Sequence, residues 1–111
     1  MAEVVDRYTY RVAWSEEEQE FTGLCAEFAL LSHFDETPEK ALAGIRDLVA
    51  FSVNWLREEG KPVPEPLSTR RYSGTITLRI PPDTHRALAM DAAEAGVSMN
   101  RLAAERLTLR R

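Results

Sequence analysis

The last forty residues constrain the fold most strongly, because they contain one alternating segment and two helical segments. From Ser73 to Pro81 apolar and polar side chains alternate, which is the pattern of a β-strand with one buried face. The apolar positions are Ile76, Leu78 and Ile80, and the polar positions are Thr75, Thr77 and Arg79. Pro81 and Pro82 end the strand, since proline cannot extend a ladder. No second strand follows, so we expect the same strand of another chain to pair with it.

Two helices are predicted after this strand. The first runs from about Asp83 to Ala95 and ends at Gly96, and the second runs from about Met99 to Leu109 with Ser98 as its N-cap. A segment of this length seldom buries enough surface to fold without a metal, a disulfide or a partner. We therefore predict a homodimer or a higher even-numbered oligomer. Its shared core would contain Ile76, Leu78, Ile80, Leu88, Ala92, Val97, Leu102, Ala103 and Leu107.

The polar face of the paired strands predicts binding to DNA. A two-stranded antiparallel ribbon fits the major groove, where side chains meet the edges of the bases. Arg79 would make a bidentate contact to guanine, and Thr75 and Thr77 would meet thymine methyls or base acceptors. Arg79 also fits a solvated surface charge, so the pattern alone leaves both interpretations open.

Phosphate contacts are predicted at two places. The first turn of the second helix, around Ser98 and Asn100, leaves backbone N–H groups free at the positive end of the helix dipole. Arg70 and Arg71, just before the strand, would add contacts to the DNA backbone. Ser98 fits a purely structural N-cap as well.

The first sixty residues predict a small α+β unit with a three-stranded antiparallel sheet. Arg7–Trp14 alternates strictly, Phe21–Ala26 gives a second strand, and Ala29–Phe34 gives a third. The polar connection at residues 15–19 suits a hairpin between the first two strands.

One helix is predicted to cover this sheet. Thr37 is its N-cap, Pro38 occupies its first position, and Gly60 stops it near Glu59. Its apolar face contains Ala41, Leu42, Ile45, Leu48, Val49, Val53 and Leu56. Trp14, Phe51 and Trp55 are expected in the core or, where exposed, at a protein interface. Residues 61–71 contain three prolines and no apolar period, so we predict a linker between units at residues 1–60 and 72–111.

Charge differs sharply between the two halves of the chain. Residues 1–60 carry five Lys and Arg against thirteen Asp and Glu, a net charge of -8, whereas residues 61–111 carry nine against five, a net charge of +4. Together they give the net charge of -4 for the whole chain. The division suggests a polyanion as partner for the basic half and a basic protein for the acidic half, although two merely solvated surfaces would fit the charges too.

Several classes of function find no support in the sequence. No apolar run approaches the roughly 20 residues needed to span a bilayer, and the N-terminus lacks a secretion signal. The single cysteine, Cys25, fits the reducing cytoplasm and suits a half-buried strand better than a catalytic nucleophile. His33 and His85 are far apart, and Glu16–Glu18 fits a solvated turn better than a metal site. We expect no catalytic residues, no metal and no cofactor.

The C-terminal segment SGTITLRIPPDTHRALAMDAAEAGVSMNRLAAERL resembles a ribbon-helix-helix domain of the Arc/MetJ type. Ahead of it, YRVAWSEEEQEFTGLCAEF and TPEKALAGI resemble the N-terminal half of HicB-family antitoxins. Two features depart from that pattern. Ala29 stands where many relatives have proline, and there is little room after the helix for a further strand.

The resemblance implies a function as well as a fold. It implies a reduced RNase H-like body without nuclease activity that binds HicA, a small basic RNA-cleaving toxin, and a tail that represses the operon encoding both proteins. It also implies that Thr75, Thr77 and Arg79 read bases while Ser98 and Asn100 bind phosphate. The alternative is a ribbon-helix-helix regulator whose N-terminal domain senses a small molecule or another protein, with no toxin.

Overall fold

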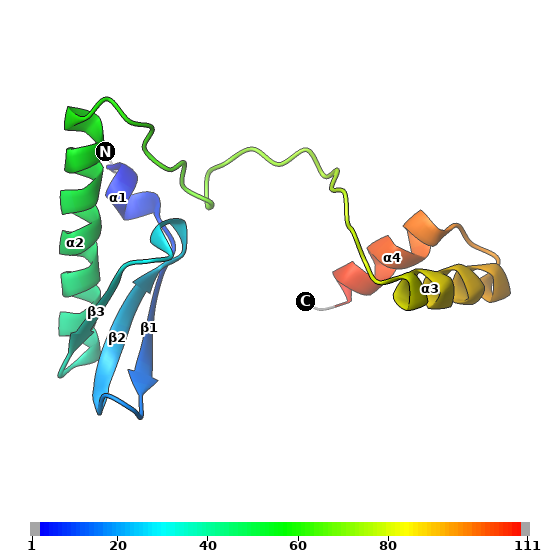
Figure 1. The fold of residues 1–111 in the computed structure, drawn as a ribbon, viewed down its shortest axis with the longest axis horizontal. Helices are drawn as coiled ribbons and strands as arrows, with labels where there is room; N and C mark the ends of the chain where they lie inside the picture. The colour runs from blue at the N-terminus through cyan, green and yellow to red at the C-terminus, as the bar shows by residue number, and fades with distance from the viewer. Residues whose placement is uncertain (1–2, 110–111) are drawn as a thin grey trace. The chain divides into compact units, whose positions relative to one another are not determined.

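The computed structural model describes residues 3–109, which divide into two compact units between Tyr72 and Ser73 (Figure 1). We call the residues before this boundary the N-terminal unit and those after it the C-terminal unit. The elements of the N-terminal unit are α1 (Val4–Arg7), β1 (Tyr10–Ser15), β2 (Glu20–Cys25), the 3-10 turn η1 (Ala26–Phe28), β3 (Ser32–Asp35) and α2 (Pro38–Glu58). The C-terminal unit contains α3 (Pro82–Ala95) and α4 (Met99–Thr108). The predicted α+β class is confirmed.

The sheet is antiparallel and three-stranded, as predicted, and its strand order is β1-β2-β3. β1 begins at Tyr10 and not at Arg7, because the Thr9 amide donates to the Glu27 side chain instead of to a neighbouring strand. β3 begins at Ser32 and not at Ala29, because the chain after β2 first makes the turn η1. The short helix α1 was not expected from the sequence.

α2 covers one face of the sheet (Figure 1). The Thr37 hydroxyl caps it by accepting from the Lys40 amide at 3.1 Å, and Pro38 takes the first helical position, as predicted. Its buried face consists of Ala41, Ile45, Val49 and Val53, which follow one another at four-residue spacing. The predicted stripe is therefore slightly rotated, and Leu42 is exposed at its edge.

The core of the N-terminal unit lies between α2 and the sheet. It consists of Tyr8, Cys25, Ile45, Val49 and Val53, all of which are buried. Cys25 ends β2 as a small buried residue, as the sequence predicted. The expectation that Trp14, Phe51 and Trp55 lie in the core is wrong, because all three are exposed. The periodicity placed them on regular elements, but it does not show which side of an element another element covers.

The first part of residues 61–71, predicted as a linker, belongs to the N-terminal unit and contacts its other elements. The Tyr8 hydroxyl donates to the Pro64 carbonyl at 2.7 Å, and the Ser68 hydroxyl donates to the Arg7 carbonyl at 2.6 Å. Val63 packs against the core, and Pro66 is buried. This segment is thus irregular, as its prolines require, but it is held by hydrogen bonds and packing up to Ser68.

The C-terminal unit is a pair of helices joined by a short turn. Gly96 ends α3 in the left-handed conformation, at a φ of 68°, and its position just after the helix is the one that favours glycine. Ser98 caps α4 by accepting from the Arg101 amide at 3.0 Å. An ion pair of 2.7 Å between Arg106 and Asp91 links the two helices. Both helix boundaries lie within one residue of those predicted.

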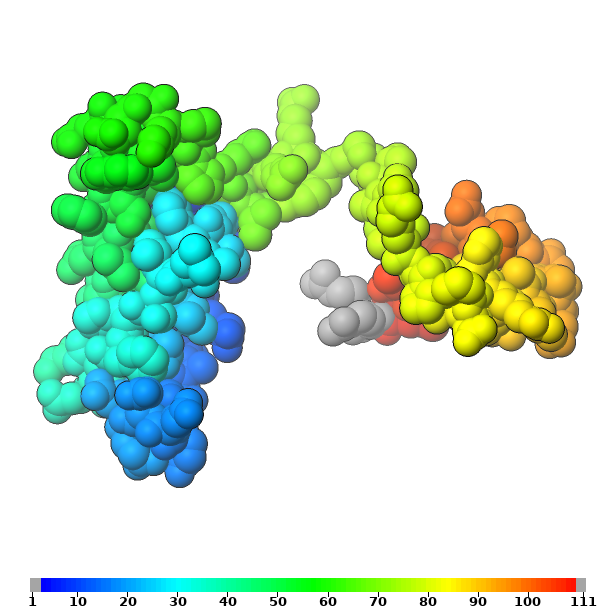
Figure 2. Space-filling view, viewed as in Figure 1, coloured from blue at the N-terminus to red at the C-terminus, as the bar shows by residue number. Residues whose placement is uncertain are grey.

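Residues 73–81 form no strand in the single chain, and their pairing with a second chain stays a prediction. A strand needs a hydrogen-bonded neighbour, and none of the residues 3–109 provides one for this segment. Figure 2 shows the yellow-green stretch before α3 as a single thickness of chain. Its apolar side chains are correspondingly open: Ile76, Leu78 and Ile80 are 69%, 61% and 41% exposed.

Candidate functional site

The residues predicted to contact DNA bases lie on the unpaired segment before α3. Thr75, Thr77 and Arg79 are all exposed there. Locally, the Thr75 amide donates to the Ser73 hydroxyl at 3.0 Å. The structure thus gathers the three residues on one short exposed segment, which a second strand is free to approach.

The predicted phosphate contacts fall in both units. Ser98 and Asn100 stand together at the exposed start of α4, where the Ser98 hydroxyl is already used in capping. Arg70 and Arg71 belong to the N-terminal unit, and both are exposed. The Arg70 guanidinium lies 6.0 Å from the centre of the Tyr72 ring, at the limit of a cation–π contact. The start of α4 therefore combines a cap with free N–H groups.

The C-terminal unit leaves most of its apolar side chains uncovered. Among its described residues only Ala92 is buried, while Leu88, Val97, Leu102 and Ala103 are half-buried. Large exposed apolar residues are Ile76, Leu78, Ile80, Met90, Met99, Leu107 and Leu109. A helix pair with this little buried surface is too small to be stable alone, and exposed apolar patches commonly mark interaction sites.

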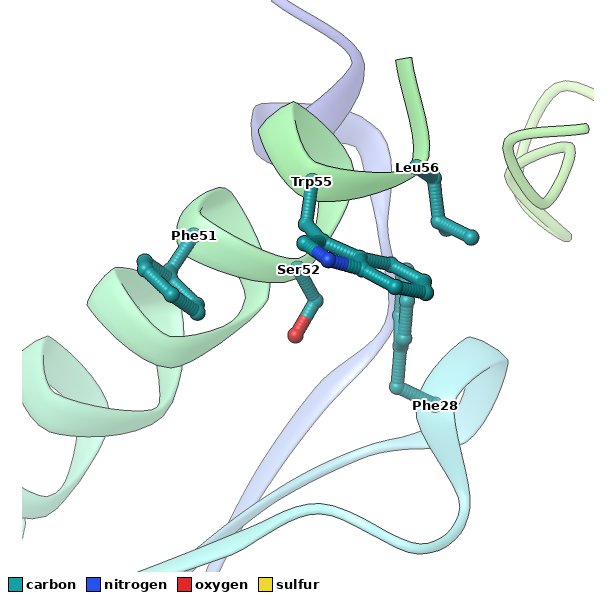
Figure 3. A pocket seen from close by; sticks show the side chains of 5 residues that line it. All are labelled: Phe28, Phe51, Ser52, Trp55 and Leu56. Atoms are coloured by element: carbon teal, nitrogen blue, oxygen red, sulfur yellow. The ribbon is translucent and has the colours of Figure 1, made fainter. Parts of the chain in front are cut away.

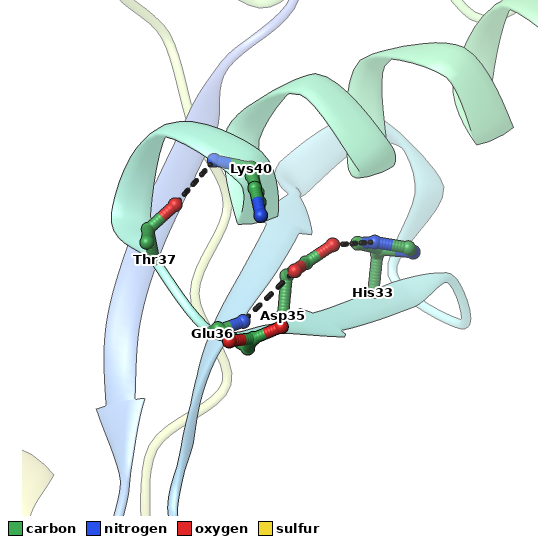
Figure 4. Close-up of polar contacts among 5 residues, drawn as sticks. All are labelled: His33, Asp35, Glu36, Thr37 and Lys40. Atoms are coloured by element: carbon green, nitrogen blue, oxygen red, sulfur yellow. Dashed lines mark hydrogen bonds and ion pairs between the residues drawn. The ribbon is translucent and has the colours of Figure 1, made fainter.

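His33 and Asp35 form a polar pair on β3, in front of the cap of α2 (Figure 4). His33 Nε2 lies 3.0 Å from an Asp35 carboxylate oxygen, and the Glu36 amide donates to the other oxygen at 2.9 Å. These two hydrogen bonds, that from His33 above all, lower the pKa of Asp35. The His33 ring also lies against Gly44 of α2. The pair therefore has a structural role, because Asp35 orients the His33 ring and this ring contacts the helix.

No group of three His, Cys, Asp or Glu side chains suited to a metal occurs within residues 3–109. Burial raises the pKa of the Cys25 thiol, so the reactive thiolate is disfavoured at neutral pH. Of the helices in the described part of the chain, none combines the length and apolar character of a membrane span.

Glu27 is a site that the sequence did not indicate. Its carboxylate accepts from the Thr9 amide at 2.9 Å, from the Thr9 hydroxyl at 3.2 Å and from the Leu67 amide at 2.9 Å. Burial alone would raise the pKa of this carboxyl, but its hydrogen bonds, those from the amides of Thr9 and Leu67 above all, together outweigh burial and lower the pKa. Glu27 thereby joins η1, the start of β1 and the segment after α2.

A groove of aromatic side chains opens beside the C-terminal half of α2 (Figure 3). We call it the aromatic groove, and it is lined by Phe28, Phe51, Ser52, Trp55 and Leu56. Phe51 is 70% exposed and Trp55 is 46% exposed. The sequence carried one signal for it, since Phe51 and Trp55 are four residues apart and share a helix face.

Comparison with known proteins bears on the second half of the chain. A model of the HicB family matches residues 55–107. The match covers just under half of the chain, from the end of α2 through the segment 61–71 to α4. Searches of curated proteins and of solved structures gave no match. Over these residues the chain is therefore similar to the HicB family.

Proposed function

We propose that the chain is the antitoxin of a HicAB-type toxin–antitoxin pair and the repressor of its own operon. The observation that carries the proposal is the match of residues 55–107 to the HicB family. In this proposal the N-terminal unit, a reduced RNase H-like body, neutralises a small basic RNA-cleaving toxin of the HicA kind. The C-terminal unit dimerises as a ribbon-helix-helix domain and binds operator DNA. The chain itself performs no catalysis.

Charge and exposure support the two halves of this proposal separately. The net charge of -8 over residues 1–60 favours fast encounter with a basic protein. Residues 61–111 carry the opposite charge, which favours a polyanion. The exposed apolar row Ile76, Leu78 and Ile80 supports pairing with a second chain, because pairing would bury these side chains in a shared core.

Co-expression tests toxin neutralisation. We expect a reading frame for a small basic protein beside the gene, whose expression alone arrests growth and whose co-expression with this chain restores it. Growth arrest that this chain does not relieve would contradict the antitoxin role. A chain that binds upstream DNA while no such neighbour exists would favour the alternative regulator, whose N-terminal unit senses a different signal.

Arg79 provides the test of sequence reading. We expect Arg79→Ala to abolish selective binding to operator DNA in a gel shift, while toxin neutralisation persists. Arg79→Lys keeps the charge but loses the bidentate fork, so it should retain non-specific affinity and lose about 1–3 kcal/mol of discrimination between bases. Arg86→Ala in α3 is the matched control for loss of one exposed positive charge. Unchanged operator selectivity in Arg79→Ala would contradict the assignment of this residue.

A further inference from the structure

The outward side of α2 combines aromatic and acidic residues in a repeated spacing. Asp47, Phe51 and Trp55 follow one another at four-residue intervals, and Glu58 comes one turn after Trp55. In an α-helix such residues share one face. All four are exposed. The face is therefore an apolar centre with a carboxylate at each end.

The aromatic groove beside this face has a firm floor. Phe28 comes from η1 and meets the buried Tyr8 ring edge to face, with ring centres 5.4 Å apart. Trp55 extends from α2 toward Phe28 (Figure 3), and the Lys61 ammonium lies 4.6 Å from the centre of its indole ring. Phe28 and Trp55 thus each have a neighbouring contact, while the exposed Phe51 leaves the groove open to an incoming side chain.

We propose that the aromatic groove binds an amphipathic segment of a basic protein. An apolar anchor of the partner would fill the groove, and Lys or Arg side chains beside that anchor would pair with Asp47 and Glu58. Neither carboxylate has an ion-pair partner among the residues that the structure describes. Where that basic protein is the toxin, the inference rests on the proposed function and names the surface of the antitoxin that holds it.

Two other occupants fit less well. A second copy of the chain would bring together two acidic surfaces, because residues 1–60 carry a net charge of -8. Asp47 and Glu58 would then face like charges. A small molecule would need polar groups to orient it. The one hydroxyl of the lining, that of Ser52, already donates to the Leu48 carbonyl at 3.0 Å.

Fluorescence of Trp55 in the full-length chain tests the chemistry of the groove without a toxin. Trp14→Phe leaves Trp55 as the sole tryptophan. The probes are two synthetic helical peptides with the same leucine stripe, flanked by Arg and Lys in one and by Glu in the other. We expect saturable binding of the basic peptide and about tenfold weaker binding of the acidic peptide. Phe51→Ala should weaken binding of the basic peptide to a similar extent. Absence of saturation, equal binding of both peptides, or no effect of Phe51→Ala would overturn the proposal.

The purified toxin tests the biological partner. Phe51→Ala and Trp55→Ala should each weaken its binding at least about tenfold, because truncated aromatic anchors are the costly positions of an interface. Trp14→Ala is the matched control, since Trp14 is 48% exposed in the same unit, and it should leave binding unchanged. Circular dichroism melting shows that each variant is folded.

The outcomes separate the two proposals. A toxin that is neutralised equally well by the groove variants would overturn the docking surface and leave the antitoxin role standing. Peptide binding that depends on the groove, in a chain that neutralises no toxin, would support the docking surface and overturn the antitoxin role. A smaller assembly of the groove variants in sedimentation velocity would show a second copy in the groove, and would also overturn the proposal.

Discussion

At the scale of single residues, two glycines show how closely α2 approaches the sheet. A Cβ on Gly23 would lie 2.3 Å from the Ala41 carbonyl oxygen, which belongs to the helix backbone. A Cβ on Gly44 would lie 2.0 Å from the His33 ring, which belongs to a side chain that can rotate. Only the first contact is between groups that cannot yield without moving a whole element.

We therefore expect different effects of alanine at the two glycines. Gly23→Ala should lower the free energy of unfolding by about 3 kcal/mol, at the upper end of the cost of overpacking. Gly44→Ala should lower it by less than Gly23→Ala does, because the His33 ring can turn away at the cost of its hydrogen bond to Asp35, and alanine adds up to about 1 kcal/mol of helix propensity. Urea unfolding of both variants measures the difference. Equal destabilisation would contradict the distinction between a fixed and a mobile neighbour.

Glu27 gives a dependence on pH. Its pKa is lowered in the folded protein from an ordinary 4.5, so its contribution to stability is complete above that value. As the pH falls through the lowered pKa, the carboxylate is protonated and its hydrogen bonds weaken. The amide proton of Leu67 should then titrate in NMR spectra at a midpoint below 4.5. Glu27→Gln should remove this titration. If the Leu67 signal titrated equally in Glu27→Gln, the titration would belong to another group.

At the scale of elements, local sequence signals predicted where the helices begin and end. They could not predict structure that depends on a neighbouring element. The caps Thr37 and Ser98 and the stop at Gly96 placed α2, α3 and α4 closely, because a cap needs only residues within one turn. The strand predicted at residues 73–81 needs a partner that a single chain lacks. The groove at Phe51 escaped prediction because periodicity reveals a face but not what covers it.

Ser98 allows the structural cap to be separated from a phosphate site. Ser98→Asp should preserve the melting temperature, since aspartate is a good N-cap and suits the positive end of the helix dipole. It should nevertheless weaken DNA binding at least about tenfold, because its charge would face a phosphate. Ser98→Ala should instead cost about 1 kcal/mol of stability. Unchanged DNA affinity in Ser98→Asp would contradict the phosphate contact and show that Ser98 only caps the helix.

At the scale of the whole molecule, the two units contain unequal amounts of core. The N-terminal unit closes a core between α2 and its sheet, whereas the C-terminal unit buries only Ala92 among its described residues. We propose a second copy of the chain as the partner, because two copies would present the same apolar row to a common interior. Stability of the C-terminal unit should then depend on the concentration of the chain.

Adjacent positions on the alternating segment test this dependence. Leu78→Glu places a charge on the apolar side, so we expect a monomer in sedimentation equilibrium, a lost concentration dependence of melting and no operator binding. Thr77→Glu places the same charge on the opposite side, so we expect a dimer that binds operator DNA poorly because its carboxylates repel the phosphates. Both variants should still neutralise the toxin through the N-terminal unit. If Leu78→Glu remained a dimer while Thr77→Glu dissociated, the segment would pair through its other face. Because a period of two places each residue on one side only, that result would contradict the base-reading assignments of Thr75, Thr77 and Arg79.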